Sequence, residues 1–191
     1  GIESEQRLNG YGVSACAVCD GFFFKGKEVA IVGAGDTAAE EALYLSKICS
    51  QVHMIVRKGE MRASKIMQDR VIKTPNIKIY WYSETDEVLG DKKVEAVRIK
   101  NTQTGEKQEI PVSAFFVAIG HHPNSDIFKG FLDMDEAGYI KTIPGTSKTN
   151  IEGVFASGDV QDKIYRQAVT AAGSGCIGAL DAERYLSAKG I

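Results

Sequence analysis

The chain has 191 residues, of which 43% are hydrophobic and 25% are charged, and its formal net charge at pH 7 is -2. This composition is typical of a packed globular protein and excludes an intrinsically disordered chain. There is no positive excess for binding phosphate backbones, and no apolar run approaches the ~20 residues that span a bilayer, so we expect neither nucleic acid nor a membrane as a partner.

Cysteine content and the N-terminal sequence bear on the cellular compartment. Four cysteines are too few for a secreted scaffold held together by disulfides. The opening residues, GIESEQ, contain neither the basic nor the apolar region of a signal peptide, which predicts a cytoplasmic location. Cys49 and Cys176 stand alone in apolar helical patterns, and we expect both to be buried packing residues.

Cys16 and Cys19 are separated by two residues, a spacing that can close a small, reducible disulfide and store two electrons. The neighbouring Asp20 is a candidate proton donor to a departing thiolate, although an acid before Gly21 is also an ordinary turn residue. Half of a zinc site, two ordinary buried cysteines and a thioredoxin-type motif are alternatives. The other cysteines and the three histidines supply no matching ligand pattern, so we predict no metal site.

Residues 28–32 (EVAIV) form a short apolar run that predicts a buried strand of a parallel sheet. A helix follows from Thr37, because its apolar residues recur at helical spacing, and residues 51–56 predict a second strand. This order of strand, glycine turn, helix and strand is the βαβ unit of dinucleotide-binding domains.

The turn between strand and helix carries the pattern G-x-G-x-x-A at Gly33, Gly35 and Ala38. Gly33 permits the tight turn, Gly35 lets backbone N–H groups approach a pyrophosphate, and Ala38 lets the helix pack closely. Any tight turn can use small residues, so the pattern gains its meaning from the βαβ unit around it.

The second strand ends in Arg57 and Lys58, with Arg62 nearby, where NAD sites place a carboxylate for the ribose 2′-hydroxyl. Three cations can instead hold a 2′-phosphate by charge-assisted hydrogen bonds. A solvated cationic loop is the alternative, but at this position the pattern favours NADPH over NADH.

The rest of the first domain alternates between helical and strand patterns. We expect a helix over residues 65–72, a strand over 77–82, an antiparallel hairpin over 94–101 and 106–111, and a strand over 114–119 that ends at Gly120. A boundary follows near residue 125.

Beyond that boundary, the sequence predicts a short strand at 154–156, a glycine turn at 157–159 and a long helix over 166–186. Electron transfer from a nicotinamide to a disulfide generally uses a flavin relay, yet the chain has no second glycine-rich nucleotide turn. Asp159, after a strand and ahead of a helix, is a candidate to hold a ribityl or ribose hydroxyl, although the residues alone indicate only a strand, a turn and a helix.

The segments CAVCDG, VGAGDTAAEEALYLS, VRKGEMRAS, FFVAIGHHPN and GVFASGDVQDKIYRQAVTAAGSGCIGALDAERYL resemble, in that order, low-molecular-weight thioredoxin reductases. The resemblance implies a homodimeric flavoprotein that passes electrons from NADPH through FAD to the cysteine pair and then to thioredoxin. The residues that match the redox pair and its acid are Cys16, Cys19 and Asp20. Those that match NADPH contacts are Gly35, Asp36, Thr37, Arg57, Lys58 and Arg62, to which we add Gly33, Ala38 and Gly120 as cofactor-binding candidates. Those that match FAD contacts are Gly158, Asp159, Arg166, Gln167 and Ala168.

Two features depart from the family pattern. A His-Arg-Arg triplet is replaced by Val56, Arg57 and Lys58, which predicts a slightly weaker preference for NADPH. The family's N-terminal FAD half is missing, in keeping with Gly1 in place of an initiator Met, so we expect this chain alone to hold FAD poorly.

The predicted fold is α/β: a Rossmann-like, three-layer NADPH-binding domain with an antiparallel hairpin insertion over residues 1–125, then the C-terminal part of a split FAD-binding domain over 126–191. The predicted function is part of a flavin-dependent thioredoxin reductase. The alternatives are a related reductase of a peroxiredoxin or another small disulfide protein, and a non-catalytic NADPH-binding module.

Overall fold

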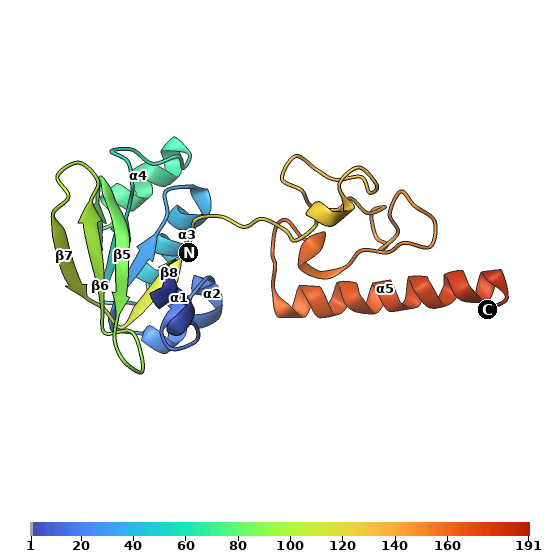
Figure 1. Cartoon of the computed structure of the whole chain (residues 1–191), viewed down its shortest axis with the longest axis horizontal. Helices are drawn as coiled ribbons and strands as arrows, with labels where there is room; N and C mark the ends of the chain where they lie inside the picture. The colour runs from blue at the N-terminus through green and yellow to red at the C-terminus, as the bar shows by residue number, and fades with distance from the viewer. Residues whose placement is uncertain (1) are drawn as a thin grey trace. The chain divides into compact units, whose positions relative to one another are not determined.

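The computed structural model describes residues 2–191 and divides the chain into two compact units, Gly1–Gly120 and His121–Ile191 (Figure 1). The division follows Gly120, a few residues before the boundary that the sequence suggested.

The first unit is built on a five-stranded parallel sheet with the order β1-β8-β2-β3-β4. Its strands are β1 (Val13–Ser14), β2 (Glu28–Val32), β3 (Gln51–Ile55), β4 (Ile77–Tyr80) and β8 (Ala114–Val117). The helices of this unit are α1 (Glu3–Arg7), α2 (Ala17–Asp20), the 3₁₀ turn η1 (Gly21–Phe24), α3 (Asp36–Ser46) and α4 (Lys65–Lys73). The predicted βαβ unit is confirmed as β2, α3 and β3, and the last strand, β8, is inserted beside β2 inside the sheet.

Both faces of the parallel sheet are covered. Val29 and Ile31 of β2 pack in the core that includes buried residues of α3, whereas Ala30 packs in the core on the opposite face. Because no face of β2 meets solvent, the strand is apolar at nearly every position. Full burial of such a valine or isoleucine side chain stabilises the fold by roughly 1.5–3 kcal/mol.

The opposite face is covered by an antiparallel sheet of three strands, β5 (Ser83–Leu89), β6 (Ala96–Asn101) and β7 (Lys107–Pro111) (Figure 1). The predicted hairpin is confirmed as β6 and β7. The sequence prediction lacked β5, because its residues SETDEVL are mostly polar. Val88 is the buried anchor of this strand, and Glu87 forms an ion pair with Arg98 of β6 at 2.7 Å.

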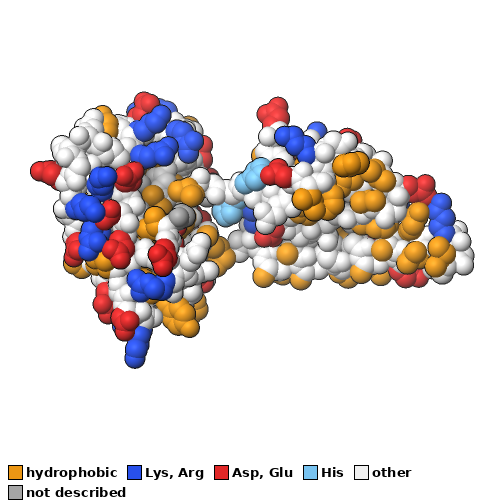
Figure 2. Space-filling model, viewed as in Figure 1, with side chains coloured by type: hydrophobic (Ala, Val, Ile, Leu, Met, Phe, Trp, Pro, Cys, Tyr) orange, Lys and Arg blue, Asp and Glu red, His pale blue; other side chains and the backbone are white. Residues whose placement is uncertain are grey.

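The second unit contains the 3₁₀ turns η2 (Asp126–Phe128) and η3 (Gly158–Val160) and the long helix α5 (Ala168–Lys189). Its apolar core is small and centres on Leu132, Ile140 and Ala156. Asp181 is the buried residue of α5, and its Oδ2 accepts hydrogen bonds from the N–H and hydroxyl of Ser147 at 2.8 Å each. The exposed apolar side chains of α5 are Val169, Ile177, Leu180 and Leu186, and Figure 2 shows hydrophobic side chains along this helix.

Two sequence predictions in this unit are corrected. The strand at 154–156 reduces to an isolated bridge between Phe155 and Lys148, because the chain turns at Gly158, where φ is +72°. The helix begins at Ala168 rather than at Arg166, since Arg166 lies in the left-handed region with φ of +48° and cannot continue a right-handed helix. In residues 2–191, no helix has the length and apolar character needed to cross a bilayer.

Candidate active site

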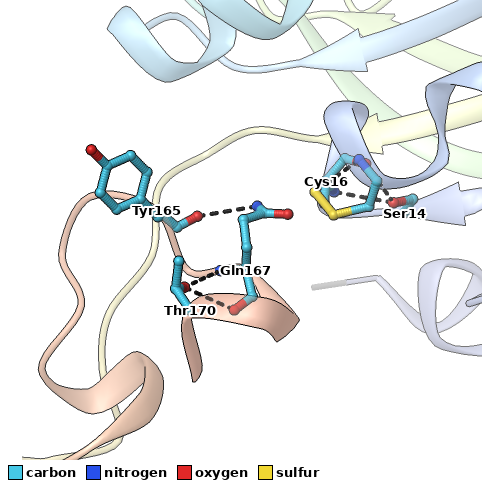
Figure 3. The surroundings of a disulfide bond; sticks show 6 residues. Ser14, Cys16, Tyr165, Gln167 and Thr170 are labelled. Atoms are coloured by element: carbon cyan, nitrogen blue, oxygen red, sulfur yellow. Dashed lines mark hydrogen bonds between the residues drawn. A yellow bond between two sulfur atoms is a disulfide. The ribbon is translucent and has the colours of Figure 1, made fainter. Parts of the chain in front are cut away.

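Cys16 and Cys19 form a disulfide at the start of α2, with a Cα–Cα distance of 5.3 Å. Cys16 is the N-cap residue, and its Sγ accepts a hydrogen bond from the backbone N–H of Cys19 at 3.2 Å. The hydroxyl oxygen of Ser14, in β1, accepts the N–H of Cys16 at 3.1 Å (Figure 3). The backbone N–H of Asp20 donates to the Cys16 carbonyl at 3.1 Å, so this acid belongs to the same helical turn as both sulfurs.

The helical turn that carries Cys16 and Cys19 is packed against α3. Ala17 is fully buried in the core shared with α3. Gly21 lies so close to α3 that a Cβ atom there would stand 3.0 Å from Leu45 and 3.3 Å from Tyr44. The disulfide is therefore fixed on the same rigid body as the glycine-rich turn.

An apolar surface follows the cysteine pair directly. The side chains of Phe22 and Phe23 are 65% and 76% exposed. The sequence analysis missed these residues, although the run of three phenylalanines after the cysteines is the signal that would have found them. Large exposed aromatic groups beside a reactive bond are typical of a surface that binds another protein.

The glycine-rich turn has the geometry that its residues predict. Gly33 has φ of +149°, and a Cβ there would overlap the Ala118 carbonyl and stand 2.7 Å from the Ala38 side chain. Gly35 is the N-cap of α3, and a Cβ there would meet open space. Asp36 and Thr37 form the first turn of α3, and the Asp36 carboxylate accepts the N–H of Ser64 at 2.9 Å.

A cleft of about 440 Å³ lies at the carboxyl ends of β2, β3 and β8. It brings Gly33 and Ala34 together with the three predicted cations, Arg57, Lys58 and Arg62. The backbone N–H of Arg62 donates to the Ala34 carbonyl at 2.7 Å, which ties the cationic loop to the glycine-rich turn. Figure 2 shows Lys and Arg side chains gathered near α4 in this unit.

Carboxylates also line this cleft, which the sequence analysis did not foresee. They are Glu5, Glu60 and Glu84. A dianionic 2′-phosphate therefore meets both signs of charge, and its binding depends on how accurately the cations are placed.

In the second unit, Asp159 and Arg166 line one cleft of about 300 Å³ together with Tyr139. Arg166 Nη1 donates to the Tyr139 hydroxyl at 3.5 Å. The carboxylate of Asp162 accepts backbone N–H groups from the loop that leads to Arg166. Burial would raise the pKa of Asp162, but the hydrogen bonds from Tyr165, Arg166 and Ile164 lower it below its ordinary value.

The other predicted FAD contacts lie in the same unit. Gly158 has a left-handed backbone, and its N–H donates to the Ser174 hydroxyl at 2.9 Å. Gln167 is the N-cap of α5 and Ala168 is its first residue. The amide of Gln167 donates to the Tyr165 carbonyl at 3.1 Å, and its backbone pairs with Thr170 (Figure 3). Gly120, with φ of +105°, ends the first unit.

The two remaining cysteines differ from each other. Cys49 is buried as predicted, and burial raises the pKa of its thiol to about 11. Cys176 is exposed, which corrects the prediction that it is a packing residue. It stands in α5, whose apolar side chains include several that face outward instead of into a core.

The family model of pyridine nucleotide-disulphide oxidoreductases matches residues 1–175. The chain belongs to this family. This oxidoreductase chain is 53% identical over 189 residues to the thioredoxin reductase of Rickettsia felis, covering 97% of the chain and 61% of that relative. It is 50% identical over 194 residues to NADPH-dependent thioredoxin reductase 3 of Arabidopsis thaliana, covering 100% of the chain and 37% of the relative.

Among solved structures, thioredoxin reductase from Streptococcus pyogenes superposes with a TM-score of 0.92 at 36% identity, covering 98% of this chain and 61% of the other. The resemblance to thioredoxin reductases and the α/β fold class are thus confirmed. The oxidoreductase chain spans about three fifths of the length of the Rickettsia relative.

Family membership implies the use of NADPH and FAD, and the residues of the oxidoreductase chain can be tested for fit to each. The open space at Gly35 and the cations of the cleft fit a dinucleotide with a 2′-phosphate. The cleft at Asp159 and Arg166 fits one portion of a larger polar ligand.

Proposed function

We propose that this chain is the NADPH-binding and disulfide-carrying part of a flavin-dependent thioredoxin reductase. The observation that carries the proposal is the position of the turn that bears the Cys16–Cys19 disulfide. Through Ala17 and Gly21 this turn packs on α3, the helix that directly follows the glycine-rich turn at the nucleotide cleft. The family assignment supports the same conclusion.

The glycine-rich turn and the cationic loop would hold NADPH. Gly35 leaves room for the pyrophosphate at the N-terminus of α3, where unpaired N–H groups favour negative charge. Arg57, Lys58 and Arg62 would bind the 2′-phosphate. Asp36 would fix the position of this loop, because its carboxylate accepts a hydrogen bond from the backbone N–H of Ser64.

Residues 126–191, which lie within the second unit, would supply part of an FAD site. Asp159 would accept hydrogen bonds from ligand hydroxyls, and Gly158, Arg166, Gln167 and Ala168 would contact the flavin nucleotide near the start of α5. The small apolar core of this unit supports its assignment as one part of a larger domain.

NADPH and FAD, when bound, would supply two electrons to the disulfide. The residues of this chain then manage sulfur chemistry: the Cys16–Cys19 bond breaks as it accepts two electrons and two protons, giving two thiols. A thiolate attacks the partner disulfide and forms a mixed disulfide, and the second cysteine resolves it, which restores Cys16–Cys19 and releases the reduced partner. Asp20 would deliver the proton to a departing thiolate.

The partner we propose is thioredoxin, with a peroxiredoxin or another small disulfide protein as the alternative acceptor. The exposed Phe22 and Phe23 beside the disulfide support a protein rather than a small molecule. A cytoplasmic homodimer is the assembly that the family resemblance implies.

Turnover of the full-length protein tests the proposal. Thioredoxin reduction should be rapid with NADPH as the electron donor and slow with NADH. It should be abolished when Cys16 and Cys19 are both changed to serine. Equal turnover with and without the two cysteines would contradict the assignment, and faster turnover with peroxiredoxin would favour the alternative acceptor.

A further inference from the structure

The phenol ring of Tyr82 lies against the α-carbon of Gly59, in the loop that carries Arg57 and Lys58. A Cβ atom at Gly59 would overlap the hydroxyl oxygen and the adjacent ring carbon of Tyr82. Gly59 does not require glycine for its backbone angles, because its φ lies outside the left-handed region. An alanine at this position would therefore displace the end of the Tyr82 side chain.

The backbone of the same loop is hydrogen-bonded by two residues that flank strands of the three-stranded sheet. The N–H of Tyr82 donates to the Lys58 carbonyl at 3.3 Å. The hydroxyl of Thr102, in the turn after β6, lies 3.5 Å from the Arg57 carbonyl and donates to the Tyr82 carbonyl at 3.1 Å. Arg57 and Lys58, two of the three cationic residues that line the cleft, are therefore both anchored through their carbonyls.

Tyr82 adopts a backbone conformation that is unfavourable for its residue type. Its φ is +51°, in the left-handed region that bulky residues rarely occupy. The N–H of Thr102 also donates to its carbonyl, at 2.6 Å, so contacts on both sides hold it there. Unfavourable backbone conformations that neighbouring contacts maintain are concentrated at functional sites.

We propose that Tyr82 is a positioning residue for selection of the 2′-phosphate of NADPH. Its ring covers Gly59 and fixes the Arg57–Lys58 segment, so that these flexible side chains reach the phosphate with less conformational freedom to lose. Accurate placement matters here because Glu60 and Glu84 line the same cleft. This inference rests on the proposed binding of NADPH.

Calorimetric titration of the 191-residue chain with NADP⁺ and with NAD⁺ tests the inference, because the dissociation constant for NAD⁺ divided by that for NADP⁺ reports phosphate selection rather than stability. Tyr82→Ala should weaken NADP⁺ binding by about tenfold while leaving NAD⁺ binding unchanged. Tyr82→Phe keeps the ring and should keep the ratio. Tyr11→Ala is the matched control, because Tyr11 is exposed and outside the cleft.

Gly59→Ala provides an independent variant that retains Tyr82. It should reduce the ratio in the parent chain and have no further effect in the Tyr82→Ala background, where the overlapping ring is gone. Should Tyr82→Ala fail to fold, Gly59→Ala and Tyr82→Phe still decide the question.

The outcomes separate the two proposals. Equal affinity of the parent for NADP⁺ and NAD⁺ would overturn the NADPH assignment, and with it the role of Tyr82. A parent that prefers NADP⁺, combined with an unchanged ratio in Tyr82→Ala and in Gly59→Ala, would overturn only the role of Tyr82.

Discussion

The backbone N–H of Cys19 donates a hydrogen bond to the Sγ atom of Cys16 across 3.2 Å. A donor directed at sulfur stabilises the charged thiolate more than the neutral thiol. Cys16 is also half-buried, whereas Cys19 is exposed. The two sulfurs are therefore not equivalent once the disulfide opens.

Because Cys19 is exposed and Cys16 is half-buried, we predict that Cys19 forms the bond to the protein partner and that Cys16 resolves it. A Cys16→Ser variant of the full-length protein should accumulate a mixed disulfide through Cys19, while Cys19→Ser should accumulate little. Non-reducing electrophoresis and peptide mass spectrometry would identify the linkage, and a trapped bond through Cys16 would contradict the prediction.

Phe22 and Phe23 should matter for a protein acceptor and not for a small one. Replacing both by alanine in the full-length protein removes exposed apolar area beside the disulfide, and we expect kcat/KM for thioredoxin to fall by roughly tenfold or more. Reduction of a small aromatic disulfide should be nearly unchanged. Equal losses for both substrates would indicate a structural role instead.

The two glycines of the nucleotide turn should respond differently to alanine. Gly33→Ala should destabilise the first unit by roughly 3 kcal/mol, since its Cβ overlaps the Ala118 carbonyl at a positive φ. Gly35→Ala should change stability by no more than about 1 kcal/mol. It should nevertheless weaken NADPH binding by about tenfold, because the methyl group would stand where the pyrophosphate approaches.

Urea unfolding measures the first effect, and calorimetry with the nucleotide measures the second. A folded Gly33→Ala chain of parental stability would contradict the packing argument, whereas unaltered nucleotide binding by Gly35→Ala would contradict the site.

The free cysteines should differ in reactivity. At pH 8, iodoacetamide should label Cys176 rapidly and leave Cys49 unmodified until the chain unfolds, because burial raises the pKa of Cys49 to about 11. The contribution of Cys49 to stability is complete below the unfolded-state value of 9.0 and decreases as pH rises toward 11. Mass spectrometry after timed quenching gives the labelling, and rapid labelling of Cys49 in the native chain would contradict it.

The pH effect has its own control. Cys49→Ala should lose less of its stability between pH 9 and 11 than the parent, as measured by thermal unfolding. Identical losses in both chains would show that other groups account for the alkaline change.

The sequence by itself determined the features that depend on neighbouring residues. The βαβ unit, its glycine turn and the close cysteine pair follow from local spacing, because a strand, a tight turn and a small disulfide loop each impose their own pattern. The sequence also indicated that Arg57, Lys58 and Arg62 lie together, since all three are in the loop that follows a recognisable strand.

Tertiary structure alone decided the features that depend on distant partners. The polar strand β5 exists because the sheet beneath it and β6 beside it supply its contacts, and Cys176 is exposed because its place on α5 faces away from a core. Gly59 and Tyr82 are neighbours only after the chain has folded. Gly59 lies in the loop after β3 of the parallel sheet, and Tyr82 directly precedes β5 of the antiparallel sheet, so no local pattern encodes their contact.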